Sequence, residues 1–153
     1  DAGTMRPSSE VPLRTMRGND LPDVAGYDVA AFGADRSAVL SGIRARRSDC
    51  AVLAEHDGRI AGYVLARDGR VATQIGPLVA DTPELAEALL ASVLARIEGP
   101  VFVDLFDRQH AVAKRLAALG FRAQRPLARM LAGGKGATYD RARTVLAAGP
   151  ELG

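Results

Sequence analysis

The stretch CAVLAEHDGRIAGYVLARDGRVATQIGPLVA, residues 50–80, decides the fold of this 153-residue chain. It contains three runs rich in β-branched and other strand-forming residues, at 50–56, 59–67 and 70–80. Asp57-Gly58 and Asp68-Gly69 separate the runs, and Asp-Gly is among the strongest signals for a tight hairpin turn. The pattern therefore predicts three consecutive antiparallel strands.

Upstream of these strands the sequence predicts two helices and an edge strand. Residues 11–16 (VPLRTM) can form only an edge strand, since Pro12 has no N–H to donate to a ladder. Helices are predicted over 21–32 and 36–47, with Gly33 ending the first. Residues 1–10 are polar and contain Pro and Ser, which predicts a linker.

Downstream the hydrophobic period changes from two to about 3.6 residues. Thr82-Pro83-Glu84 is a helix start, with a capping residue, Pro in the first turn and an acid near the positive end of the dipole. An apolar stripe follows at Leu85, Leu89, Val93 and Ile97.

After this helix the sequence predicts a further strand, helix and strand. Residues 100–106 (PVFVDLF) predict a strand, and a strand–helix–strand passage implies a parallel crossover. Residues 109–119 predict another helix, and 121–131 a last strand broken at Pro126. Residues 133–136 (GGKG) predict a flexible joint.

The composition excludes several classes of protein. One Cys cannot form an internal disulfide, and two His without clustered acids predict no metal site. A net charge of +2 and the absence of Trp argue against nucleic-acid binding. No apolar run approaches the roughly 20 residues of a membrane span. We therefore expect a cytoplasmic protein with no membrane partner.

The element order, together with IAGYV at 60–64, IGPLV at 75–79 and Gly120-Phe121 closing the late helix, resembles the GNAT superfamily of acyl-CoA-dependent N-acyltransferases. The resemblance covers residues 11–153 and implies one α/β domain. The expected fold is a GNAT-like mixed, mainly antiparallel sheet with helices on both faces.

Shorter motifs resemble a subgroup found as the C-terminal half of two-lobed GNAT proteins. They are FGADR at 32–36, the short stretch 76–90 and the ending GPELG at 149–153. This likeness implies an N-terminal GNAT lobe in the same parent chain as a partner.

The resemblance also implies a site for acetyl-CoA, the expected acyl donor. In the family, the fourth strand parts from the fifth and exposes amides that bind pantetheine and polarise the thioester. The following helix N-terminus holds the pyrophosphate. The positions implied here are Gly76, Pro77, Leu78 and Val79 for pantetheine, Asp81, Thr82, Glu84, Leu85 and Ala86 for the pyrophosphate, and Gln109 for a further pantetheine contact.

Two functional positions depart from the family pattern. Asp81, Glu84 and Ala86 stand where the family has a basic residue and a Gly-x-Gly or Gly-x-Ala loop, and carboxylates near a pyrophosphate weaken its binding. Leu116 stands where the family has a Tyr that protonates the departing thiolate, and a leucine cannot donate a proton.

The candidate catalytic residues are two acids. Asp104 interrupts an apolar run, which suits a general base or a carboxylate bonded to a nearby Arg. Glu55 lies at a strand end, where it is either a base or a solvated acid. For substrate binding the candidates are Asp28, Asp35 and Arg36, with a helix cap and an ion pair as the alternative reading.

Two functions remain open from the sequence. The first is an N-acyltransferase that uses acetyl-CoA as the expected donor and moves an acyl group to an amine. The second is a non-catalytic GNAT-fold lobe of a tandem protein, which does not bind the cofactor and completes a substrate pocket or an interface.

Overall fold

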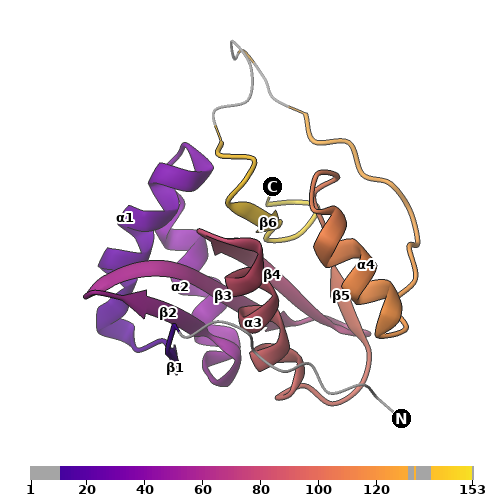
Figure 1. Ribbon diagram of the computed structural model, residues 1–153, viewed down its shortest axis with the longest axis horizontal. Coiled ribbons are helices and arrows are strands. Elements are labelled where there is room, and N and C mark those ends of the chain that lie inside the picture. Colours follow the sequence, from indigo (N-terminus) through magenta and orange to yellow (C-terminus); the bar gives the residue numbers. More distant parts are fainter. Residues whose placement is uncertain (1–10, 131–132, 134–138, 153) are drawn as a thin grey trace.

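The computed structural model describes residues 11–130, 133 and 139–152 (Figure 1). The predicted linker at 1–10 and most of the predicted joint at 133–136 lie outside these residues. The strands are β1 (Leu13–Thr15), β2 (Val52–His56), β3 (Arg59–Asp68), β4 (Thr73–Ala80), β5 (Val101–Val103) and β6 (Thr144–Leu146). The helices are α1 (Leu21–Phe32), α2 (Ser37–Arg46), α3 (Pro83–Leu94) and α4 (His110–Ala118), with short 3₁₀ turns at Gly18–Asp20 and Ser48–Cys50.

The strands form one mixed sheet in the order β1-β2-β3-β4-β5, and β6 also pairs with β4. The pairs from β1 to β4 are antiparallel, whereas β4 and β5 are parallel. The first hairpin turns through Asp57 and Gly58, which have φ of 50° and 72°, as a tight turn at an Asp-Gly pair requires. The predicted three-strand meander, crossover and mainly antiparallel sheet are therefore confirmed. The second connection differs from the prediction, since Asp68 still belongs to β3, residues 69–72 form a longer loop than a two-residue turn, and β4 begins at Thr73 rather than at residue 70.

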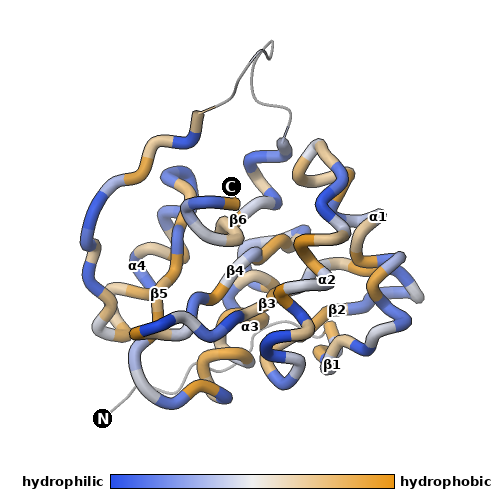
Figure 2. Tube along the Cα trace, turned by 180° about the vertical axis from the view of Figure 1, so that it is seen from behind, coloured by the Kyte–Doolittle hydropathy of each residue, from blue (hydrophilic) through white to orange (hydrophobic). Residues whose placement is uncertain are grey.

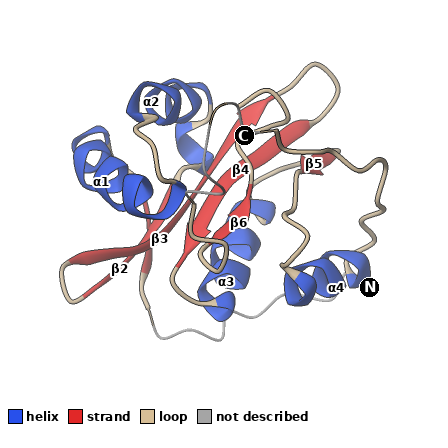
Figure 3. Cartoon of the chain, turned by 90° about the horizontal axis from the view of Figure 1, so that it is seen from above, coloured by secondary structure: helices blue, strands red, loops and turns tan. Residues whose placement is uncertain are grey.

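Helices cover both faces of the sheet, as Figure 3 shows, with α1 and α2 on one side and α3 and α4 on the other. Successive side chains along each central strand point alternately to these two faces. Leu53, Tyr63 and Leu65 pack in the core beneath α1 and α2. Their neighbours Val52 and Val64 pack in the core beneath α3. This alternation of side chains across a strand builds two apolar layers from one sheet.

Helix α3 carries much of the second core. Thr82 caps it, because its Oγ1 accepts a hydrogen bond of 3.2 Å from Leu85 N. Leu85, Leu89 and Val93 are buried, and the helix ends at Leu94, so Ile97 follows the helix and packs against the core from a loop. The predicted stripe is confirmed over its first three positions.

Replacing Leu89 by alanine should lower the free energy of unfolding by about 2–5 kcal/mol, through lost burial and the cavity left behind. Leu89 is fully buried between the helix and the sheet. Urea unfolding followed by circular dichroism measures the loss. A loss below about 0.5 kcal/mol would mean that the cavity term is absent and the helix packs differently.

The predicted last strand at 121–131 is wrong in its described part, 121–130, which contains no strand. Residues 122–128 are exposed and run outside the sheet, and Figure 2 shows hydrophilic residues along much of this segment. The sixth strand is Thr144–Leu146 instead, where three buried residues meet β4. The strand predicted over 100–106 is also shorter than expected and ends at Val103, so Asp104 follows it.

None of the described helices is both long and apolar enough to cross a membrane.

Candidate functional site

Strands β4 and β5 part from each other midway along β4. They pair only where Thr73, Gln74 and Ile75 face Val101, Phe102 and Val103. Beyond Ile75 the two strands separate. This opening is where the family resemblance implies the pantetheine arm of the acyl donor.

Strand β6 lies in this opening and bonds to both sides of it. Towards β4, Leu146 pairs with Leu78 and Thr144 with Val79. The amide of Ala80 continues this pairing and donates to Arg143 O at 3.0 Å. The hydrogen-bonding edge of β4 is therefore bonded to the chain's own C-terminal segment (Figure 1).

On its other side β6 bonds to the segment that follows β5. Ala147 N donates to Asp104 O at 2.9 Å, and Phe106 N donates to Val145 O at 3.2 Å. Sequence reasoning missed this strand. The short apolar run TVLAA at 144–148 is the signal that could have indicated it.

The C-terminal segment also passes directly over Gly76. This glycine has a φ of 147°, and a Cβ built on it would stand 1.9 Å from Ala147 O. Only a residue without a side chain allows such an approach. The prediction that Gly76, Pro77, Leu78 and Val79 hold pantetheine remains untested, and it requires β6 to leave β4.

The predicted pyrophosphate positions surround the start of α3. Asp81 accepts a hydrogen bond of 2.9 Å from Tyr27 Oη and lies 3.6 Å from Arg143 Nη1 in an ion pair. Burial, followed by the Asp81 carboxylate, raises the pKa of Tyr27. Thr82 uses its hydroxyl to cap the helix, and Glu84 is exposed in the first turn. Leu85 and Ala86 are buried.

Gln109 also contacts the C-terminal segment. Its Nε2 donates to the carbonyl oxygen of Thr144 at 3.1 Å and to those of Arg141 and Ala142 at 3.3 and 3.4 Å. In this structure Gln109 therefore joins the start of α4 to β6 and the residues before it. Its predicted contact with pantetheine is untested.

Asp28 and Arg36, two of the predicted substrate-binding residues, form an ion pair in the core. Arg36 donates twice to the Asp28 carboxylate, from Nε at 2.8 Å and from Nη2 at 2.9 Å. Tyr63 Oη donates to the same carboxylate at 2.6 Å. Burial raises the pKa of Tyr63 far above its usual value, and the Asp28 charge adds to this. Asp28 is fully buried and Arg36 nearly so.

Asp35, the third predicted substrate-binding residue, is exposed at the start of α2. Its Oδ1 accepts a hydrogen bond of 2.9 Å from Ser37 N, as a residue that begins a helix does. The structure therefore does not bring the three residues together at an open surface.

The two predicted catalytic acids are also held by different surroundings. Glu55 pairs with Arg14 at 2.9 Å, and Arg14 also binds Asp20. Asp104 follows β5 and accepts a hydrogen bond of 3.1 Å from Gln74 Nε2. Burial raises the pKa of Asp104 above its usual value, and the negative charge of Glu151 raises it further. The hydrogen bond from Gln74 lowers the pKa but does not cancel this rise.

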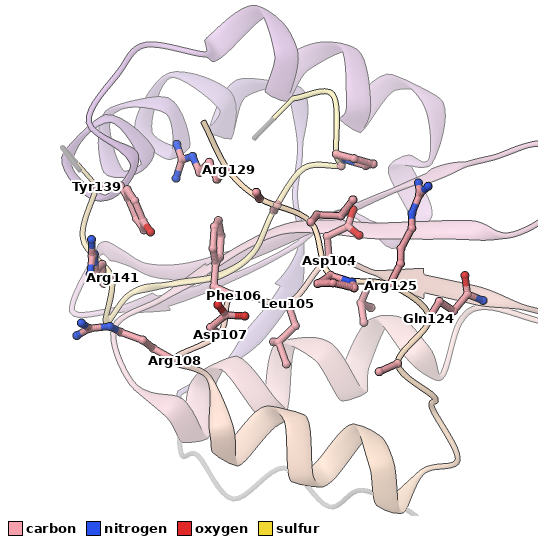
Figure 4. Close-up of a pocket in the computed structure, with 18 residues that line it drawn as sticks. Asp104, Leu105, Phe106, Asp107, Arg108, Gln124, Arg125, Arg129, Tyr139 and Arg141 are labelled. Carbon is pink, nitrogen blue, oxygen red and sulfur yellow. The ribbon is translucent and has the colours of Figure 1, made fainter. Parts of the chain in front are cut away.

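Asp104 lines a cavity of about 710 Å³, which Figure 4 shows. The cavity lies between the loop after β5, the extended segment before residue 130 and the C-terminal segment. Its polar lining residues are Asp104, Asp107, Arg108, Gln124, Arg125, Arg129, Tyr139 and Arg141. Its volume is in the range of small-molecule sites.

The free energy of unfolding of Asp104→Asn, relative to that of the wild type, should increase as the pH rises. The raised pKa means that Asp104 itself binds more protons in the folded chain than in the unfolded chain above pH 3.8, so the contribution of Asp104 to wild-type stability falls as the pH rises through its raised pKa. Asparagine cannot ionise. Urea unfolding at several pH values from 3.5 to 7 measures the difference between variant and wild type, and a difference independent of pH would contradict this effect.

A mainly antiparallel sheet whose fourth strand parts from a parallel fifth, with helices on both faces, defines the class of acyl-CoA N-acyltransferase folds. The family described as "Acetyltransferase (GNAT) domain" matches residues 24–145. The chain therefore belongs to the GNAT superfamily.

A curated relative is similar over much of the chain. It is "Uncharacterized N-acetyltransferase YitH" of Bacillus subtilis (strain 168), 27% identical over 112 residues. The match covers 73% of this chain and 40% of the relative, so the chain corresponds to less than half of that protein.

Proposed function

We propose that this chain is an accessory lobe of an acyl-CoA-dependent N-acyltransferase. Another lobe of the same parent protein binds acetyl-CoA, and this lobe completes the pocket for the acceptor amine. The observation that carries the proposal is β6, which bonds to Leu78, Val79 and Ala80 within the β4–β5 opening.

The filled opening does not fit a pantetheine arm. Acyl transfer in this superfamily needs free amides on β4, because they hold the arm and stabilise charge on the thioester oxygen. Here these positions pair with β6, and Ala147 O fills the space above Gly76. We therefore derive no acyl-transfer step within this lobe.

Charge at α3 supports the same conclusion. Asp81 and Glu84 stand at the helix start, where a pyrophosphate needs positive potential. An unpaired carboxylate about 4 Å from a phosphate charge opposes binding by about 1 kcal/mol in bulk water and about 4 kcal/mol near a protein surface. The ion pair with Arg143 reduces this repulsion at Asp81, whereas no described cation pairs with Glu84. In addition, Leu116 is buried and has no proton to donate.

A second candidate is catalysis by this lobe itself. Asp104 favours it, because a partly buried carboxylate with a raised pKa beside a cavity suits a general base for an amine. This candidate requires β6 to withdraw from β4 during the reaction. Glu55 is a weaker choice of base, since Arg14 already holds it.

A thiol-release assay separates the two candidates. The purified 153-residue chain is incubated with acetyl-CoA and a panel of amines, and free thiol is followed with a chromogenic disulfide. The accessory-lobe proposal expects no release above the enzyme-free rate. Release that disappears in Asp104→Asn and persists in Asp23→Asn, an exposed acid on α1, would overturn it in favour of catalysis here.

A further inference from the structure

The cavity beside Asp104 has an excess of positive charge. Four arginines and two aspartates line it, and the remaining wall is largely apolar, with Leu105, Phe106, Leu127 and Pro150 among the lining residues. Such a lining favours a small molecule with an anionic group and an apolar body. The cavity's charge therefore argues for an organic anion rather than for a simple amine.

Arg129 is the best-placed of these arginines to bind an anion. Its guanidinium carbon lies 4.4 Å from the ring centre of Tyr139, 4.9 Å from that of Phe32 and 5.8 Å from that of Phe106. These three rings come from different parts of the chain and surround the guanidinium at cation–π distances, which limits its freedom. An arginine held in this way loses little freedom when it binds a ligand.

The Arg129 guanidinium also has a donor that no described residue satisfies. Its Nη1 is buried and makes no hydrogen bond within the described part of the chain. Ring faces attract the cation but do not replace an oxygen acceptor. The planar fork of an arginine matches the two oxygens of a carboxylate.

Asp104 supplies the opposite charge in the same cavity. Figure 4 shows Arg129 and Tyr139 towards one end of the cavity and Asp104 towards the other, with Phe106 lying between them. An ammonium group at Asp104 would offset the charge of its carboxylate, which is partly buried. The two ends of the cavity therefore carry opposite charges and suit two oppositely charged groups of one molecule.

We propose that this cavity binds an organic acid that also carries an amine, with the carboxylate on Arg129 and the amine at Asp104. The inference rests on the proposed function in one respect, since it names this molecule as the acceptor class. Binding itself does not depend on acyl transfer, so a binding experiment can fail or succeed separately from the thiol-release assay.

The test uses four small molecules that share one phenyl ring. L-Phenylalanine carries a carboxylate and an amine, 3-phenylpropanoate only the carboxylate, 2-phenylethylamine only the amine, and phenyl phosphate a phosphate. Each is titrated into the 153-residue chain and followed by amide and arginine Nε shifts in NMR spectra. We expect L-phenylalanine to bind most tightly, 3-phenylpropanoate next, and 2-phenylethylamine at least about tenfold more weakly than L-phenylalanine.

Variants then assign the two groups to the two residues. Arg129→Gln should weaken both carboxylates by at least about tenfold, because a charge-assisted bidentate bond is lost. Arg129→Lys keeps the charge without the fork, and should lie between wild type and Arg129→Gln. Asp104→Asn should remove the preference for L-phenylalanine over 3-phenylpropanoate. Arg59→Gln, at the exposed start of β3, is the matched control and should change nothing.

Three results would overturn the inference. They are tightest binding by phenyl phosphate, equal binding by 2-phenylethylamine and 3-phenylpropanoate, and binding by none of the four compounds. If Arg129→Gln does not fold, unchanged carboxylate binding by a folded Arg129→Lys, together with an unchanged preference in Asp104→Asn, would also overturn it.

Discussion

Replacing Asp28 by alanine should lower the free energy of unfolding by about 3–5 kcal/mol. Asp28 accepts two hydrogen bonds from Arg36 and one from Tyr63, all inside the core beneath α1 and α2. Alanine would remove the acceptor of two guanidinium hydrogen bonds and of the Tyr63 phenol, all of them inside the core. The cost of removing one partner of a buried ion pair is therefore much larger than the net contribution of the pair.

Urea unfolding measures this loss, with Asp23→Ala as the matched control. Asp23 lies on the same helix and is exposed, so its replacement should change stability by less than about 0.5 kcal/mol. Near-wild-type stability of Asp28→Ala would mean that the core does not depend on the carboxylate of Asp28. The predicted role of Asp28 and Arg36 in substrate binding would then regain support.

Replacing Gly76 by alanine should destabilise the chain by at least about 2 kcal/mol, since backbone strain and steric overlap each cost about 1–3 kcal/mol. The new Cβ would meet Ala147 O at 1.9 Å, at a φ of 147° that side chains rarely adopt. The overlap is relieved most directly if the C-terminal segment moves away from β4. We therefore expect faster hydrogen exchange at the amide of Ala80, which bonds to Arg143 O.

Gly42→Ala is the control for this change. Gly42 lies inside α2, and a Cβ there would meet nothing within 4 Å. Alanine should stabilise the helix by up to about 1 kcal/mol. Equal effects of the two substitutions on stability and on Ala80 exchange would show that the C-terminal segment does not lie over Gly76.

The sheet and its helices could be predicted because their signals are local. Asp57-Gly58 specifies a hairpin from two neighbouring residues, and Thr82-Pro83 specifies the start of α3 in the same way. The apolar stripe from Leu85 to Val93 needs only its own spacing. These features hold in the structure because no distant contact opposes them.

The position of β6 could not be predicted, because it depends on partners 65 and 68 residues away, at Val79 and Leu78. A strand of three residues is too short to show a clear alternating pattern. The segment at 121–130 has a stronger strand-forming composition, so the last strand was predicted there instead. The decisive requirement is steric: the close approach of Ala147 needs a glycine at 76. Sequence spacing does not reveal such a contact.

The candidate site could be predicted only in part, because some of its residues meet only through contacts between distant parts of the chain. Asp104 stood out as a charge in an apolar run, and it does line the cavity. Arg129 was not predicted as a site residue, although Arg129-Met130 matched the family resemblance, since its surroundings are rings from residues 32, 106 and 139, which only the fold brings together. Asp28 and Arg36 stood out as charges but lie closed within the core.

Calorimetric titration of the 153-residue chain with acetyl-CoA tests the central claim most directly, namely that β6 occupies the place of the acyl donor's pantetheine arm. We expect no binding heat at near-millimolar cofactor, for the wild type and for Asp81→Asn alike. Micromolar binding that tightens in Asp81→Asn, as removal of a repelling charge would produce, would contradict it.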